Sequence, residues 1–326
     1  MSILCRVTRG DLTESIHVVF AVAVDETGTI FYSTGDPYYL TCIRSSLKPF
    51  QAAAAVKAGA IDAAGFSEDE LALMCASHNG EGIHVKTVQS MLNKLGLSTA
   101  DLECGSHFPS DKITCHKMIE GGIAAVETHN NCSGKHAGML ALAKHLDHGI
   151  KGYIQKEHPV QKEIFNLVQE LTGLKKIPLE TDGCSAPTPF MTLETIAQLF
   201  QKLGAGNDQE LSRVFDAMCA NPLLVGGTNH FDSLFIEALA GRGVTKIGGE
   251  SVRGISIKKP NGSSVGIALK VLDGNFRALP IATMRLLENL ELLNPTEIEK
   301  LDKFRMKILR NHNQLEIGRI EAIVES

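Results

Sequence analysis

A serine and a lysine three residues apart are the first side chains in this sequence that could do chemistry together. Ser45 and Lys48 stand in Arg44-Ser45-Ser46-Leu47-Lys48-Pro49, directly before an alanine-rich run. Because proline is tolerated only in the first turn of a helix, Pro49 predicts a helix that begins near Lys48, with Ser45 at or just before its start. A spacing of three then lets both side chains face the same way.

This geometry suits acyl transfer. A serine hydroxyl is a poor nucleophile until a neighbouring base takes its proton, and a lysine can serve as that base only when its amine is neutral. Burial or nearby positive charge favours the neutral amine, and Arg44 is a candidate source of such charge. Backbone N–H groups at the helix start would stabilise an oxyanion. The ordinary alternative is a serine N-cap followed by a solvated lysine.

A second polar cluster, Cys75-Ala76-Ser77-His78-Asn79-Gly80-Glu81, ends an apolar stretch and precedes a helix that carries His84. Polar residues at the boundary between two elements often form sites, and Ser77 is a candidate second hydroxyl. The alternative is a capped helix start with His78 and His84 on the surface.

Two further clusters contain cysteine, at residues 130–139 and 181–189. Thiolates from Cys132 and Cys184 are plausible ligands of Zn²⁺, with His136 or another nearby donor as a third ligand and water completing a tetrahedron. The spacing matches no zinc finger, so structural cysteines in two tight turns are the alternative. The eight cysteines of the chain contain no Cys-x-x-Cys pair, and we expect most of them to be free thiols in a reducing compartment.

Composition limits the classes of partner. The chain has 326 residues, a net charge of −5 and a pI near 6.2, which argue against nucleic acid because phosphate binding needs a basic face. The longest apolar run, Val18 to Val24, is much shorter than the roughly 20 residues of a membrane helix. The first six residues lack the features of a signal peptide, so we expect a cytoplasmic protein with no membrane partner.

Hydrophobic periodicity predicts the elements that position these clusters. Alternating and β-branched runs predict a hairpin over 16–32 and another that joins 255–257 to 265–271, whereas periods of three and four predict helices around 85–95, 164–171 and 211–218. A final helical segment is expected over about 279–326. Strands near both ends with helices between them predict an α/β (α+β) fold, with a central antiparallel or mixed sheet packed against helices in a single domain, 1–326.

Taken together, four motifs resemble the Rhizobium etli-type L-asparaginases, the class 3 or thermolabile family. They begin at Arg44, Cys75, Asn131 and Asp182, and their order and separations agree with the family over about residues 9–274. The resemblance implies a fold like that of the serine β-lactamases and a homodimer. It also implies two Ser-Lys pairs, Ser45 with Lys48 and Ser77 with Lys246.

The resemblance implies the other site residues as well. Zinc would be held by Cys132, Lys135 as a neutral amine, and Cys184. Arg44 would bind the α-carboxylate of the substrate and Asp182 its α-ammonium, with His136 nearby. The chain departs from the family at His230, where an arginine is typical.

Hydrolysis of L-asparagine to L-aspartate and ammonia through a Ser45 acyl-enzyme is therefore the leading hypothesis. One alternative is a penicillin-recognising serine acyl hydrolase, although neither Ser-Asp-Asn nor Lys-Thr-Gly occurs in the chain. A second alternative is a zinc-dependent amidohydrolase of another small amide, in which the serines are secondary. A third is a protein that binds asparagine without catalysis.

Overall fold

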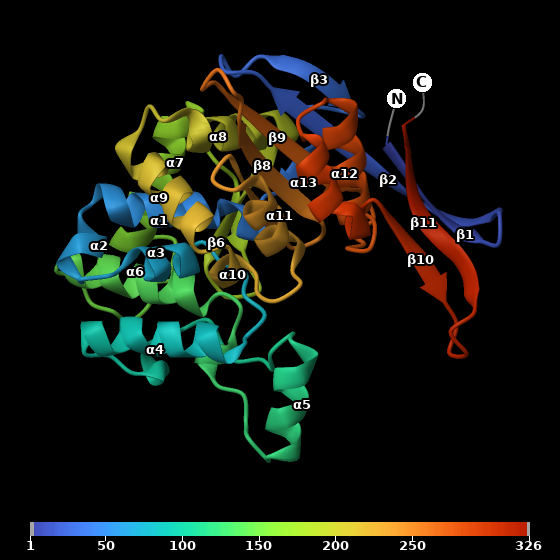
Figure 1. Ribbon diagram of the computed structural model, residues 1–326. Helices are drawn as coiled ribbons and strands as arrows, with labels where there is room; N and C mark the ends of the chain where they lie inside the picture. The colour runs from blue at the N-terminus through green and yellow to red at the C-terminus, as the bar shows by residue number, and fades with distance from the viewer. Residues whose placement is uncertain (1–2, 325–326) are drawn as a thin grey trace. The chain divides into compact units, whose positions relative to one another are not determined.

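The two ends of the described chain, residues 3–324 of the computed structural model, are neighbouring strands of one sheet. Strand β1 (Ile3–Arg9) pairs antiparallel with β11 (Glu316–Val324), and in Figure 1 the blue β1 lies beside the red β11. The chain divides into two compact units. Unit 1 contains the residues up to 46, residues 191–205 and the residues from 238 onward, and unit 2 contains residues 47–190 and 206–237.

Unit 1 is built on a sheet of eight strands among the described residues, and every pairing in it is antiparallel. The order is β10-β11-β1-β2-β9-β8-β7, and β3 pairs with β2. The other strands of this sheet are β2 (Leu12–Val24), β3 (Ile30–Thr34), β7 (Gly243–Gly248), β8 (Val252–Lys258), β9 (Ser264–Val271) and β10 (Met306–Arg310). Strand β4 (Leu40–Cys42) also belongs to unit 1 but lies outside this sheet. Both predicted hairpins, β2–β3 and β8–β9, are confirmed.

Helix α8 (Leu193–Ala205) packs against β2, β8 and β9. Two glycines let it approach the sheet closely. A Cβ atom at Gly266 would lie 1.9 Å from the carbonyl oxygen of Ala197, and one at Gly254 would lie 1.8 Å from the Phe200 ring. The absence of a side chain at these two positions therefore sets the distance between helix and sheet.

The predicted helical segment over 279–326 is only half right. Helices α12 (Leu279–Asn289) and α13 (Pro295–Lys300) and a short 3₁₀ turn (Asp302–Phe304) are present, but β10 and β11 then form a hairpin. The prediction of helix is wrong over 306–324, because β11 is stabilised by pairing with β1 at the other end of the sequence; the last two residues of the predicted segment, 325–326, lie outside the described residues. A local helical period cannot reveal such a partner.

Unit 2 consists of helices and one short hairpin, and the helices predicted around 85–95, 164–171 and 211–218 are confirmed as α4, α7 and α9. Its helices are α1 (Lys48–Lys57), α2 (Ala60–Ala63), α3 (Glu68–Met74), α4 (Gly82–Leu95), α5 (Lys112–Glu120), α6 (Ser133–His145), α7 (Pro159–Thr172), α9 (Gln209–Ala220), α10 (Pro222–Val225) and α11 (Phe231–Leu239), which continues into unit 1. Strand β5 (Leu179–Thr181) pairs antiparallel with β6 (Pro187–Thr192).

Helix α6 is the central helix of unit 2, since Ser133 through Ala143 are all buried. It packs against α1, α3, α4 and α7. A Cβ atom at Gly134 would lie 2.4 Å from the carbonyl oxygen of Leu73, so a glycine is required where α6 meets α3. The predicted arrangement of an antiparallel sheet packed against helices is thus confirmed.

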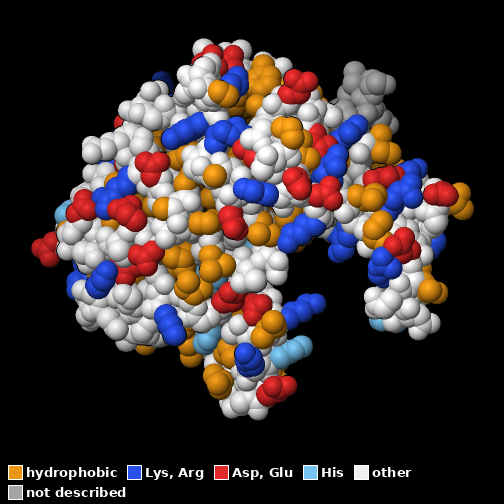
Figure 2. All heavy atoms as spheres, viewed as in Figure 1, with side chains coloured by type: hydrophobic (Ala, Val, Ile, Leu, Met, Phe, Trp, Pro, Cys, Tyr) orange, Lys and Arg blue, Asp and Glu red, His pale blue; other side chains and the backbone are white. Residues whose placement is uncertain are grey.

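Segment 108–126, which includes α5, exposes five large apolar side chains. Phe108, Ile113, Ile119, Ile123 and Val126 are 40–66% exposed. Apolar side chains are visible over α5 in the space-filling view (Figure 2).

The homodimer implied by the resemblance stays a prediction. Among the described residues, no helix is long and apolar enough to cross a membrane.

Candidate active site

The Ser45-Lys48 stretch forms the continuous helical start that Pro49 predicts. Residues Arg44–Leu47 are a 3₁₀ turn, and α1 begins at Lys48. Neither serine caps the helix, because the N-cap residue is Leu47 and no side chain caps it. Arg44 has a φ of 51°, a left-handed conformation that is rare outside glycine and often found at functional sites.

Ser45 and Ser46 have different surroundings in unit 1. Ser46 is fully buried, and its hydroxyl donates a 2.8 Å hydrogen bond to the carbonyl oxygen of Lys246 on β7. Ser45 is half-buried. The structure therefore places Lys246 beside the Ser45-Ser46 turn and gives Ser46 a structural role.

Gly248 and Gly249 make room for this turn at the end of β7. A Cβ atom at Gly248 would lie 2.6 Å from the carbonyl oxygen of Ile43, and one at Gly249 would lie 2.8 Å from Cζ of Arg44. The guanidinium of Arg44 thus lies against backbone that only glycine leaves open.

Lys48 is buried in unit 2, with 1% of its surface exposed. Its Nζ contacts the carbonyl oxygens of Ala76 and Asn131 and lies 3.1 Å from Ser77 Oγ. The two carbonyls can only accept hydrogen bonds. Nζ donates to Ser77 Oγ as well as to the two carbonyls, so this amine is held by three oxygen atoms at the candidate site.

His78 and His84 are buried, contrary to the surface alternative. The rings of His78 and His84 stack with centroids 4.9 Å apart, and His78 Nε2 lies 2.9 Å from Ser133 Oγ. Burial lowers the pKa of His78 and of His84, and for His78 the charges of His84 and Lys48 lower it further. Both imidazoles are therefore neutral at neutral pH and act as packed, hydrogen-bonded supports of the Ser77 loop.

The three candidate metal ligands also meet in unit 2. Cys132 stands directly before α6, Lys135 lies in its first turn, and Cys184 follows β5 in a turn. All three are buried, with 3–4% of each residue exposed, and Lys135 Nζ is 2.9 Å from Cys184 Sγ. Two sulfurs and one amine from distant parts of the sequence therefore converge.

The three groups of this cluster shift one another's pKa values in different directions. A hydrogen bond from Cys132 lowers the pKa of the Cys184 thiol, and the Lys135 charge lowers it further. The same hydrogen bond raises the pKa of Cys132. Burial would lower the pKa of Lys135, but the negative charges of Cys184 and Cys132 outweigh burial and raise it. Cys184 and Lys135 therefore favour each other's charged forms.

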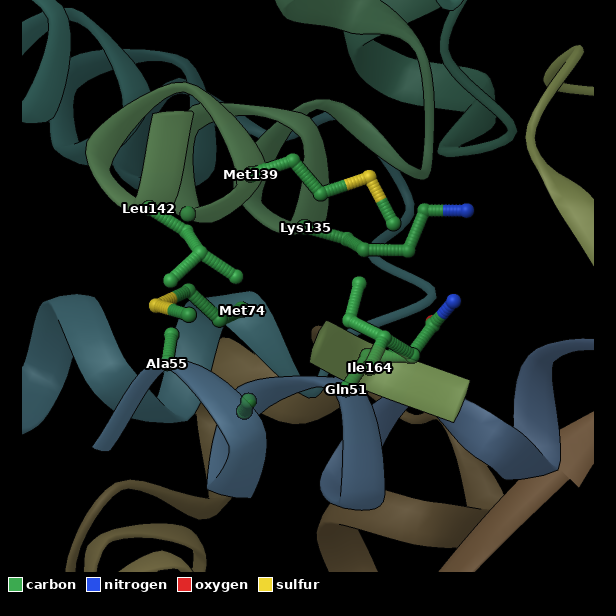
Figure 3. Close-up of a pocket in the computed structure, with 9 residues that line it drawn as sticks. Gln51, Ala55, Met74, Lys135, Met139, Leu142 and Ile164 are labelled. Atoms are coloured by element: carbon green, nitrogen blue, oxygen red, sulfur yellow. The ribbon is translucent and has the colours of Figure 1, made fainter. Parts of the chain in front are cut away.

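The donor set fits zinc, whose preferred ligands are sulfur and nitrogen. Among the described residues, no three His, Cys, Asp or Glu side chains form a metal site, so the cluster reaches three ligands only through the Lys135 amine. A cavity of about 10 Å³, room for a single water, adjoins this lysine (Figure 3). In that view Lys135 and Met139 of α6 face Gln51 of α1. The lysine stem therefore has space in which to adjust.

The predicted substrate-binding residues divide between the units. His136 and Asp182 lie in unit 2 near Cys184. The Cys184 sulfur lies 3.8 Å from Asp182 Oδ2, and burial lowers the pKa of His136 to about 4. Arg44 belongs to unit 1, with Ser45 and Lys246. Each unit thus gathers its own part of the predicted site.

His230 caps the start of α11. Its Nδ1 accepts a hydrogen bond from the backbone N–H of Asp232, and a Cβ atom at Gly226 would lie 2.4 Å from the same nitrogen. The imidazole at this position is therefore tied to local backbone, where the family usually has arginine.

A relaxed form of two tripeptides escaped the sequence reasoning. Ser77-His78-Asn79 keeps the outer residues of Ser-Asp-Asn, and Lys246-Ile247-Gly248 keeps those of Lys-Thr-Gly. Each lies at the place in its unit where candidate catalytic groups gather. The outer residues of the two tripeptides are the signal in the sequence that indicates them.

Comparison of the sequence with protein families places the chain among the amide hydrolases. The profile described as L-asparaginase II matches residues 5–322, and the chain belongs to this family. Membership implies L-asparaginase activity, EC 3.5.1.1. The resemblance inferred from four motifs is thereby confirmed.

Two solved structures resemble the chain in fold. A β-lactamase from Sphaerobacter thermophilus is 16% identical, with a TM-score of 0.43 over 86% of this chain and 93% of that chain. Mglu, in its native form in the presence of 4.3 M NaCl, is 15% identical, with a TM-score of 0.37 over 84% of this chain and 61% of that chain. A comparison with curated proteins gives no match.

Proposed function

We propose that this protein hydrolyses L-asparagine with Ser45 as the nucleophile and Lys48 as its base. Membership in the L-asparaginase II family supports the reaction. The observation that carries the mechanism is the setting of Lys48, a buried amine 3.1 Å from the Ser77 hydroxyl whose other two partners are carbonyl oxygens. Ser45 precedes this lysine by three residues in one continuous helical stretch.

The reaction proceeds in two halves. Ser45 Oγ attacks the side-chain amide carbon of asparagine, and its proton passes to Lys48 Nζ. The tetrahedral intermediate then collapses as the leaving nitrogen takes a proton, through the Ser77 hydroxyl, and departs as ammonia. The product is an aspartyl ester on Ser45, which water cleaves to release L-aspartate and restore the serine.

Charged residues suit the substrate's amino acid end. The Arg44 guanidinium matches an α-carboxylate, and the half-buried Asp182 carboxylate matches an α-ammonium. The backbone carbonyl of Lys246 lies beside the Ser45-Ser46 turn, and its Nζ donates to the carbonyl oxygen of Ile247 over 2.8 Å. Its pairing with Ser77 stays a prediction.

Ammonia release from L-asparagine by the intact protein tests this function. The proposal expects steady turnover, and binding of asparagine without ammonia release would favour a binding protein. Hydrolysis of a chromogenic cephalosporin without asparagine turnover would favour the penicillin-type alternative. Activity that survives Ser45→Ala but is abolished by chelation would favour a zinc-dependent amidohydrolase.

We also propose that Cys132, Lys135 and Cys184 hold a zinc ion. When bound, zinc supplies a positive charge that holds two thiolates and the segments that carry them. Its binding requires both thiols and the amine to lose their protons, so affinity should rise with pH.

Metal content measured by mass spectrometry tests the zinc site. We expect about one zinc per chain in the wild type and almost none in Cys184→Ser, because thiolate is lost from a site with only three protein ligands. Cys115→Ser, a change of the same kind in α5 at a half-buried free cysteine, should keep its zinc. Full zinc content in Cys184→Ser would show that the ion binds elsewhere.

A further inference from the structure

Tyr153 lies against His136 in unit 2, between α6 and α7. Its Oη is 2.8 Å from His136 Nδ1, and the two rings meet edge to face with centroids 5.5 Å apart. Both residues are 0% exposed. No sequence motif pointed to this tyrosine, so its contact with a candidate substrate-binding residue is a finding of the structure.

The direction of the hydrogen bond between Tyr153 and His136 follows from their neighbours. The backbone N–H of Glu103 donates to Tyr153 Oη over 2.7 Å, so the oxygen already accepts one hydrogen bond. Burial raises the pKa of Tyr153, so the phenol keeps its proton. Among the described residues, His136 Nδ1 is the only further hydrogen-bond partner of this hydroxyl, and a buried O–H is costly without an acceptor. Tyr153 therefore donates and Nδ1 accepts.

Two more contacts hold the phenol in place. Gln161 donates from Nε2 to the backbone carbonyl of Tyr153 over 2.8 Å, and the backbone N–H of Gly152 donates to Glu103 Oε1 over 2.9 Å. Glu103 thus contacts the tyrosine through its backbone and the preceding glycine through its side chain. These contacts keep the Tyr153 ring, and with it the hydroxyl oxygen, next to His136.

We infer that Tyr153 is a positioning residue that holds His136 in the tautomer with its proton on Nε2, so that His136 presents a hydrogen-bond donor to the site. An imidazole whose Nδ1 accepts a hydrogen bond must carry its proton on Nε2 to stay neutral. The inference rests on the proposed function and adds to it the direction of one hydrogen bond, from Tyr153 to His136.

The free side of His136 faces the thiol cluster. Since Nδ1 is taken by Tyr153, the electrostatic interaction of His136 with Cys184 falls to Nε2. This nitrogen is buried and has no hydrogen-bond partner of normal geometry in the described part of the chain. The Nε2 donor is therefore directed toward the Cys184 sulfur at the edge of the thiol cluster.

Two consequences follow for the chemistry of His136. A protonated Nε2 has no lone pair for a metal, so in this tautomer Lys135, whose Nζ contacts Cys184, is the better third donor of the thiol cluster. Any group that meets Nε2 must be an acceptor, so the Cys184 sulfur or a carboxylate or amide carbonyl oxygen fits and an amide NH₂ or ammonium does not.

Nitrogen NMR of protein labelled with ¹⁵N-histidine tests the tautomer without reference to activity. The chain has 12 histidines, and the His136 signals are those lost in His136→Gln. We expect a protonated Nε2 and an unprotonated Nδ1 in the wild type, and a mixture of tautomers in Tyr153→Phe. A wild-type signal from protonated Nδ1, or unchanged signals in Tyr153→Phe, would overturn the inference even if the protein hydrolyses asparagine.

A kinetic cycle tests whether Tyr153 acts through His136. Tyr153→Phe should lower kcat/KM for L-asparagine by about 10- to 100-fold, the size expected when a site residue loses a supporting buried hydrogen bond. In the His136→Gln background, where the amide needs no tautomer, the same change should cost less than about twofold. Equal losses in both backgrounds would show a merely structural role. Tyr32→Phe on β3 removes a half-buried phenol in unit 1 and should leave kcat/KM unchanged.

Discussion

Replacing Ser45 with alanine is expected to abolish ammonia release from L-asparagine, with kcat lower by about four orders of magnitude or more, as when other hydrolases lose their nucleophile. The loss follows because no ester can form without Oγ. Ser45 is half-buried in a 3₁₀ turn and caps no helix, so folding should be little affected. A coupled ammonia assay over a range of asparagine concentrations, together with thermal unfolding, checks both statements.

Ser46→Ala is the matched control, one residue away. Its buried hydroxyl donates to the Lys246 carbonyl, so its loss should cost about 1 kcal/mol of stability. Turnover should stay within about tenfold of the wild type, less than one general acid or base contributes. An inactive Ser46→Ala beside an active Ser45→Ala would reverse the assignment of the nucleophile.

Lys48→Met is expected to lower kcat by about 10²- to 10⁴-fold, the contribution of a positioned general base. Methionine keeps the length of the lysine stem but offers neither a proton nor a lone pair for one. The carbonyls of Ala76 and Asn131 would also lose a donor, which costs about 1–3 kcal/mol for a buried group. Rates measured well below the unfolding temperature separate the catalytic effect from the loss of stability.

Lys57→Met provides the same change at the other end of α1. Lys57 is partly exposed and forms a surface ion pair of 2.6 Å with Glu170, a type of contact worth at most about 1 kcal/mol. We expect full turnover in this variant. Full turnover in Lys48→Met as well would exclude Lys48 as the base.

The start of α1 was predictable because its cause is local. Pro49 fixes the first turn, and the alanine run after it favours helix, so α1 begins at Lys48 as expected. The two predicted hairpins also rest on local patterns, which are alternating apolar residues around polar turns. In such segments the sequence alone contains the information that decides the structure.

The burial of Lys48 could not be predicted from local sequence. A lysine beside a helix start is ordinarily solvated, and nothing in the residue types shows that Ala76 and Asn131 supply backbone carbonyls to it. These acceptors come from segments 28 and 83 residues away. The C-terminal hairpin escaped prediction for the same reason, since β11 depends on its pairing with β1.

The structure places the site residues that the resemblance implies, and some of them lie in contact with one another. Cys132, Lys135 and Cys184 lie together, and Lys48 contacts Ser77, a contact that the resemblance did not imply. The pairs Ser45–Lys48 and Ser77–Lys246 stay predictions. Tyr153 was missed because a lone tyrosine in a turn resembles any buried aromatic residue until its hydroxyl is seen to meet His136. Hydrogen-bond direction is a property of three-dimensional neighbours, and no spacing in the sequence encodes it.

Mass spectrometry of the acylated protein tests the central claim most directly. The wild type is mixed with a slow-reacting amide analogue of asparagine, quenched in acid, digested and fragmented to locate the added acyl group. The proposed mechanism predicts an ester on Ser45, absent from Ser45→Ala and present in Ser46→Ala. An ester found on Ser77 and never on Ser45 would contradict it.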